Sequence, residues 1–181
     1  MKRVVKLLCK MLAAALSFMV AGVSVMWLLF FRINTVEQKS EESVWASKGT
    51  GNALILYQKS RFSLTQDTVI CMAEGLQKEG YSVVANHPRH DVPYEIQDFD
   101  LVVLCSAVYG GTVSRPLLDY ASSHDFQGQK VVVVITGKDL STDAQIGMVM
   151  EEVKGIDDIN GIKTDRSDDD FARQFLSMIT E

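Results

Sequence analysis

The stretch SAVYGG, from Ser106 to Gly111, is the clearest candidate for a ligand-binding segment in the sequence. It follows the apolar run Leu101–Cys105, so a buried strand is expected to end where the segment begins. A tyrosine can stack on a large flat ring, and paired glycines let the backbone approach such a ring closely. A flat ligand would explain the tyrosine and the glycines together, whereas a plain turn with a surface tyrosine explains only the glycines.

Other groupings of reactive residue types give weaker indications. His87 and His90, in the stretch HPRH, precede Asp91, and two histidines with a carboxylate can bind zinc. A surface loop that contains proline is a poor frame for such a site and no further ligand is evident, so no metal site is predicted. The three cysteines form no zinc pattern, and the sequence has no GxSxG or Walker motif that would indicate a hydrolase.

Apolar runs alternate with helical patterns from residue 53 to the C-terminus. Continuous apolar runs, typical of strands buried on both faces, occupy residues 53–57, 81–85, 101–105 and 131–136, with a weaker one around 159–162. Apolar residues at helical spacing lie between and after these runs. The alternation predicts an α/β fold with a doubly wound, five-stranded parallel sheet. Such sheets bind ligands beyond the carboxyl ends of their strands, here the loops 58–64, 106–112 and 136–142.

Three segments resemble flavodoxins. DLVVLCSAVYGGTVSRPLLDYA is similar to their third strand and second flavin loop, ALILYQKSRFSLTQDTVICMAEGL to their first strand, phosphate loop and first helix, and VVVVITGKD to their fourth strand and third loop. The resemblance covers most of residues 53–140 and implies a flavodoxin-like fold that binds FMN noncovalently. It implies that Tyr109 stacks on the isoalloxazine ring. It further implies that the ring is contacted by the backbone of Ser106, Ala107, Val108 and Gly110, and closed in by Thr136 and Gly137.

The resemblance places the FMN phosphate at loop 58–64, where Thr65 matches the threonine that opens the first helix. Ser60 and Ser63 are further hydroxyl donors, and Lys59 or Arg61 can meet a phosphate with charge. The loop departs from the common form of the family because it has no glycine, is one residue longer, and contains bulky side chains at 61 and 62. A loop that has lost its affinity for flavin fits the same residues, and the interpretation of retained binding rests on the helix N-terminus.

An apolar segment precedes the α/β region. Met11 to Phe31 contains no charge and is about 30 Å long as a helix, the thickness of a hydrocarbon core. A secretory signal peptide is the competing interpretation, but the run is long for one and no small-x-small cleavage site follows it. We therefore expect a single-pass anchor in the cell membrane over residues 1–32, a polar linker over 33–52 and the globular domain over 53–181.

Charge bears on the side of the membrane and on the partner. Four basic residues precede the apolar run and fewer follow it closely, which favours an extracytoplasmic domain. Residues 1–32 hold five of the 18 basic residues and none of the 23 acidic ones, so the remainder carries 13 basic against 23 acidic residues, a net charge of −10. Such a surface disfavours nucleic acid and suits a basic partner or a small ligand.

These observations predict a membrane-anchored electron-transfer protein whose FMN exchanges electrons with a partner protein or a quinone. FAR, in DDDFARQFLSMI, also resembles the closing helix of menaquinone-dependent protoporphyrinogen oxidases, although the long insertion of those flavodoxin-like enzymes after the fourth strand is absent. A quinone-linked FMN oxidoreductase is therefore the second interpretation, and no residue can be named as its acid or base. A flavin-free interaction module that kept the fold is the third.

Overall fold

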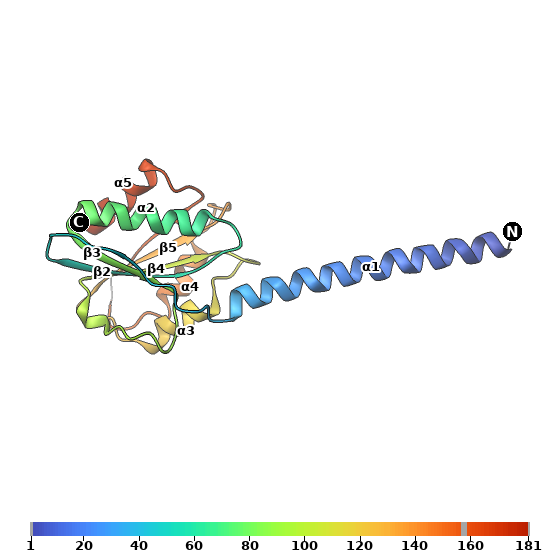
Figure 1. Cartoon of the computed structure of the whole chain (residues 1–181), viewed down its shortest axis with the longest axis horizontal. Coiled ribbons are helices and arrows are strands. Elements are labelled where there is room, and N and C mark those ends of the chain that lie inside the picture. Colours follow the sequence, from blue (N-terminus) through green and yellow to red (C-terminus); the bar gives the residue numbers. More distant parts are fainter. Residues whose placement is uncertain (1, 157–158, 181) are drawn as a thin grey trace. The chain divides into compact units, whose positions relative to one another are not determined.

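The structure, a computed structural model, describes residues 2–156 and 159–180 (Figure 1). The chain divides into two compact units, residues 1–33 and 34–181. The first unit is the helix α1 (Lys2–Thr35), whose last two residues lie beyond the unit boundary. This helix is long and apolar enough to cross a membrane, with a mean hydropathy of 2.2 over its most apolar part. A signal sequence near the N-terminus has the same character. The hydroxyls of Ser17 and Ser24 donate to helix carbonyls one turn earlier, each at 2.9 Å, so both are satisfied within the helix.

The second unit is built on one six-stranded sheet in the order β1-β3-β2-β4-β5-β6. Its strands are β1 (Ser43–Trp45), β2 (Gly51–Gln58), β3 (Tyr81–Asn86), β4 (Leu101–Ala107), β5 (Lys130–Thr136) and β6 (Asn160–Thr164). The five strands β2 to β6 are parallel, as the apolar runs predict, and the chain winds outward in both directions from β2 and β4. The predicted doubly wound α/β fold is confirmed.

The sheet differs from the prediction by one strand. β1 comes from the segment interpreted as linker and pairs antiparallel with β3, from Ser43 opposite Ala85 to Trp45 opposite Val83. Only Trp45 of this strand is half-buried, and it packs against the core, while its two neighbours are exposed. A strand of three residues with a single inward side chain has no detectable period, so the polar composition of the segment dominated its interpretation.

Helices cover both faces of the sheet. The helices α2 (Leu64–Lys78) and α5 (Asp169–Thr180) pack on one face, with Met72 and Phe175 fully buried, and α3 (Arg115–Ser123) and α4 (Ala144–Met150) pack on the other (Figure 1). Alternate residues of each strand serve the two cores, so in β2 Ile55 belongs to the first core and Leu54 to the second. Because both faces are covered, the edge formed by the carboxyl ends of the strands is where loops are free to carry a site.

Candidate functional site

The carboxyl ends of β2, β4 and β5 lie side by side at one edge of the sheet. Gln58 of β2 is paired with Ser106 of β4, and Ala107 of β4 with Thr136 of β5. The three predicted loops therefore start from neighbouring positions, and we name them loop 1 (residues 58–64), loop 2 (106–112) and loop 3 (136–142). β2 and β4 are the strands between which the winding direction reverses, which is the position where open α/β sheets form their crevice.

Loop 2 is a tight hairpin turn. The amide of Tyr109 donates to the carbonyl of Thr112 at 3.1 Å, and the amide of Thr112 donates back at 3.2 Å. Between them Gly110 and Gly111 have φ angles of 60° and 81°, the left-handed values that both central residues of a type I′ turn require. The turn therefore explains the two glycines.

The tyrosine of this turn reaches loop 1. The hydroxyl of Tyr109 accepts a hydrogen bond from the amide of Arg61 at 2.7 Å, and its ring is half-buried. This places a flat aromatic side chain beside the loop that precedes α2.

Buried hydroxyls beneath the loops connect β5 with α2 and β4 with the start of α3. The Oγ1 atoms of Thr65 and Thr136 are 2.7 Å apart, and Ser106 Oγ accepts from the amide of Ser114 at 3.1 Å. All four residues are at most 2 % exposed. The side chains of Thr65 and Thr136 thus contact each other across the sheet edge, and a role for either in ligand binding stays a prediction.

Loop 1 presents a set of donors suited to a phosphate. Lys59 and Ser60 are half-buried, and Arg61 and Ser63 are exposed. The hydroxyl of Ser60 donates to the carbonyl of Phe62, while that of Ser63 forms no capping bond to the helix that follows. Two cations, the hydroxyl of Ser63 and the N-terminus of the 15-residue helix α2 match the chemistry of a phosphate dianion, while the hydroxyl of Ser60 is engaged with the carbonyl of Phe62. The donor set therefore fits the group that the resemblance implies.

A buried glutamine that the sequence analysis did not single out fixes the turn of loop 2. Gln145, 7 % exposed on α4, donates from Nε2 to the carbonyl of Gly111 at 3.1 Å. Its Oε1 accepts from the ammonium of Lys163 at 2.8 Å, and the same ammonium donates to the carbonyl of Thr142 at 2.8 Å. These contacts connect loops 2 and 3 with β6. The only sequence signal for Gln145 is a polar residue beside the apolar positions of a helix.

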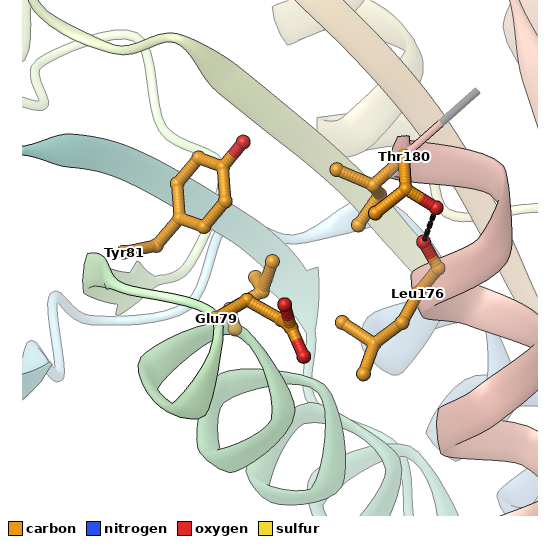
Figure 2. Close-up of a pocket in the computed structure, with 6 residues that line it drawn as sticks. Glu79, Tyr81, Leu176 and Thr180 are labelled. Carbon is orange, nitrogen blue, oxygen red and sulfur yellow. Dashed lines mark hydrogen bonds between the residues drawn. The ribbon is translucent and has the colours of Figure 1, made fainter. Parts of the chain in front are cut away.

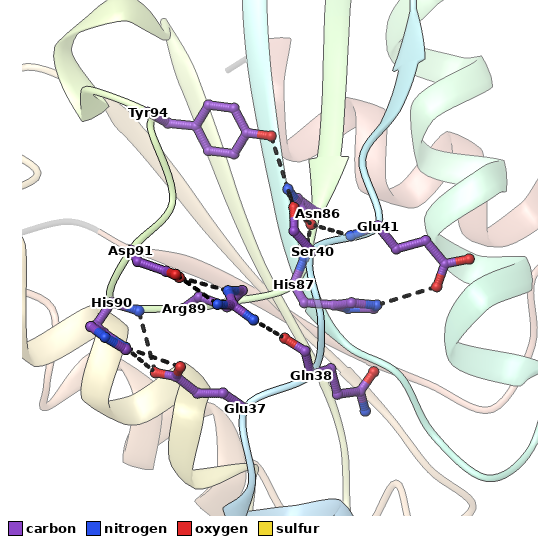
Figure 3. Close-up of polar contacts among 10 residues, drawn as sticks. All are labelled: Glu37, Gln38, Ser40, Glu41, Asn86, His87, Arg89, His90, Asp91 and Tyr94. Atoms are coloured by element: carbon purple, nitrogen blue, oxygen red, sulfur yellow. Dashed lines mark hydrogen bonds and ion pairs between the residues drawn. The ribbon is translucent and has the colours of Figure 1, made fainter.

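The segment after α1 lies along β3 and loop 1, and we name residues 36–45 the strap (Figure 3). Asn86, at the end of β3 and 1 % exposed, binds the strap with both ends of its amide. Its Oδ1 accepts from the amide of Glu41 at 2.9 Å, and its Nδ2 donates to Ser40 Oγ at 2.9 Å and to the hydroxyl of Tyr94 at 3.0 Å. The strap is thus part of the second unit.

The two histidines of HPRH do not converge on one site (Figure 3). His87 is 1 % exposed, and its Nδ1 donates to the carbonyl of Tyr57 at 2.7 Å. His90 is exposed and lies 3.0 Å from the carboxylate of Glu37 in the strap, and this hydrogen bond and charge raise its pKa.

Among the described residues, Glu37, His90 and Asp91 are close enough to share a cation. However, Arg89 donates to both carboxylate oxygens of Asp91, at 2.6 and 2.7 Å, and holds the pKa of that carboxyl below its usual range. All three residues are also exposed. The group is therefore a surface network of ion pairs.

A second depression lies at the opposite edge of the sheet (Figure 2). It has a volume of about 260 Å³, and Tyr81, the first residue of β3, lines it together with Leu76, Glu79, Leu176, Ile179 and Thr180. One carboxylate and two hydroxyls on apolar walls give no acid–base pair, so the loop edge remains the candidate site.

Solved structures with the same architecture identify the fold. Flavodoxin 2 from Bacillus cereus superposes with a TM-score of 0.54 at 18 % sequence identity, covering 72 % of this chain and 96 % of its own. A flavoprotein from Bacteroides eggerthii superposes with a TM-score of 0.53 at 13 % identity, covering 72 % of this chain and 98 % of its own. The second unit has the flavodoxin-like fold. The predicted resemblance to flavodoxins is therefore confirmed at the level of the fold.

The flavodoxin-like fold also occurs within larger proteins. A flavo-diiron protein from Thermotoga maritima superposes with a TM-score of 0.51 at 14 % identity, covering 74 % of this chain and 36 % of its own. No protein-family model matches the sequence, and no curated protein matches it in sequence. The flavodoxin-like fold is thus recognisable from the arrangement of its elements.

Proposed function

We propose that the flavodoxin-like domain binds FMN at the loop edge and transfers electrons through it. The observation that carries this proposal is the proximity of two suitable groups, the half-buried ring of Tyr109 and the phosphate-type donor set of loop 1, which one hydrogen bond from Arg61 connects. The name of the solved neighbour from Bacillus cereus, flavodoxin 2, agrees with it.

Each part of the site has a separate task in this proposal. Bound FMN supplies the redox chemistry, because its ring system accepts and donates electrons. Loop 1 and the N-terminus of α2 bind the phosphate, and Tyr109 provides a face for the ring. Gln145 keeps the turn of loop 2 in one orientation by its bond to Gly111, so the backbone presented to the ring is fixed.

The proposal extends to location and partner. We propose that α1 remains as a single-pass anchor and that the domain lies outside the cytoplasm, which the charge bias around α1 favours. The net charge of −10 after residue 32 suits a partner protein with a basic docking surface. The rate of electron transfer to such a partner is then expected to fall with increasing salt.

The test is a flavin titration of the full-length chain in detergent, followed by quenching of flavin fluorescence. We expect FMN to bind, and Tyr109→Ala to weaken binding about tenfold, since loss of one aromatic stacking contact costs about 1–3 kcal/mol. Tyr109→Phe, which keeps the ring but removes the hydroxyl that meets Arg61, is the matched variant and should bind within about threefold of the parent. A folded chain that binds no flavin would leave the flavin-free interaction module as the function.

A further inference from the structure

The strap makes three contacts with the first two residues of loop 1. Gln58 donates from Nε2 to the carbonyl of Val36 at 3.3 Å, and Gln38 of the strap donates from Nε2 to the carbonyl of Lys59 at 2.9 Å. The ammonium of Lys59 donates to Glu41 Oε2 at 3.3 Å. The strap therefore contacts both the backbone of loop 1 and the charge that loop 1 offers to an anion.

Glu41 is held in position for this contact from its backbone. Its amide donates to the buried Asn86, and its carboxylate lies 3.8 Å from the Nε2 atom of His87 (Figure 3). The same carboxylate oxygen, Oε2, lies 3.3 Å from the ammonium of Lys59. The hydrogen bond from Lys59 is the main cause that lowers the pKa of Glu41, so the carboxylate is an anion at neutral pH. The carboxylate of Glu41 is thus already paired with Lys59, a cation of the proposed phosphate-binding loop.

The ion pair is weak enough to exchange. The side chains of Lys59 and Glu41 are 38 % and 62 % exposed, and pairs of this kind contribute little because water screens them. A phosphate bound at loop 1 carries more charge than a carboxylate and would also receive hydroxyl and helix N-terminal donors. Lys59 can therefore pair with either anion. The binding free energy that Lys59 adds for the phosphate is reduced by the free energy of the ion pair with Glu41 that must first be broken.

We propose that the strap sets the affinity of the site for the phosphate of FMN, because Glu41 and that phosphate compete for Lys59. This inference rests on the proposed function. Its consequence is that any event that lifts the segment following α1 from loop 1 frees Lys59 and tightens the binding of FMN. The effect concerns the phosphate, because Glu41 and the phosphate are both anions that pair with Lys59, whereas the oxidised ring system of FMN is neutral.

The experiment compares FMN with riboflavin, which has the same ring system and no phosphate, on the full-length chain in detergent. We expect Glu41→Gln to tighten FMN binding about threefold and to leave riboflavin binding unchanged. Lys59→Met should weaken FMN binding, and in that background Glu41→Gln should have no further effect, as a double-mutant cycle requires. Glu152→Gln, an exposed residue just after α4, is the control for the same change in net charge.

Five outcomes decide the question. A gain for FMN alone that disappears in the Lys59→Met background supports the inference. Equal changes for FMN and riboflavin, or a gain that persists without Lys59, would overturn it, as would FMN binding by Glu41→Gln that equals the parent. Failure of the parent chain to bind either flavin would remove the proposed function and this inference with it. The urea midpoint of each variant shows that the fold is retained.

Discussion

Replacing Asn86 by alanine removes the buried side chain that binds Ser40 and Glu41 of the strap, at a position outside the three loops of the candidate site. The side chain of Asn86 makes five hydrogen bonds to four partners, Ser40, Glu41, Tyr94 and the amide of His87, at distances from 2.8 to 3.3 Å. Each such bond contributes about 1 kcal/mol net, and a buried donor left without a partner costs about 1–3 kcal/mol. Water can reach the exposed strap groups but not the amide of the buried His87. We therefore expect Asn86→Ala to lower the free energy of unfolding by about 3 kcal/mol.

The assay is urea unfolding of the full-length chain in detergent, followed by the fluorescence of Trp45. In a Trp27→Phe background Trp45 is the only tryptophan, and it reports on β1 directly because it packs against the core. A loss of about 3 kcal/mol corresponds to a fall in melting temperature of about 6–12 °C for a domain of this size. The control is Asn160→Ala, an exposed residue at the start of β6, with an expected change within about 0.5 kcal/mol.

The reasoning would be refuted if Asn86→Ala cost less than about 1 kcal/mol. The same conclusion would follow if Trp45 kept its native fluorescence while the strap became accessible to protease. Either result would mean that the polar contacts of the strap are replaced by water at no cost, and that β1 is held by its backbone pairing alone.

Three further predictions follow from buried or paired groups. Because Glu37 raises the pKa of His90, the stability that this pair contributes is complete below the ordinary pKa of 6.5 and is lost as pH rises through the raised pKa. NMR titration of Glu37→Gln should show a lower pKa for His90, and an unchanged pKa of His90 would contradict the pairing. Burial raises the pKa of the Cys105 thiol to about 12. In a Cys9→Ser background, iodoacetamide should therefore modify Cys105 only after unfolding, whereas the half-buried Cys71 should react slowly in the native state. Equal rates of modification of Cys71 and Cys105 in the native state would argue against the buried position of Cys105. Gln145→Leu removes the hydrogen-bond partner of both Gly111 and Lys163 and should lower the free energy of unfolding by about 1–2 kcal/mol. The control is Gln174→Leu, at an exposed residue. Equal urea midpoints for the two variants would show that the hydrogen bonds of Gln145 contribute nothing to stability.

The parallel sheet was predictable because its central strands β2, β4 and β5 are apolar runs bounded by polar residues. Leu54 and Ile55 face opposite cores, so β2 reads as continuously apolar, and the same holds for β4 and β5. The position of the loops follows from this topology alone, and so does the proximity of Tyr109 to loop 1.

The remaining features depend on contacts that leave no periodic signal. The strap is polar, and its residues bind through amides and carboxylates to partners about 20 to 50 positions later, such as Lys59 and Asn86. Gln145 was not recognised for the same reason, because its partners Gly111 and Lys163 lie on other elements. Hydrogen bonds between distant segments follow from the fold and cannot be deduced before it.

β1 also protects the sheet from association. Without it, the side of β3 that faces β1 over residues 83–85 would present unpaired backbone groups at an edge, and such an edge readily pairs with a strand of a second molecule. A soluble fragment that begins at the first apolar run, near residue 50, would create this edge and lose every strap contact. A fragment that begins at Asn34, where the second unit starts, would keep β1 on the sheet and the strap contacts. The choice of the first residue therefore decides whether the isolated domain is expected to remain monomeric.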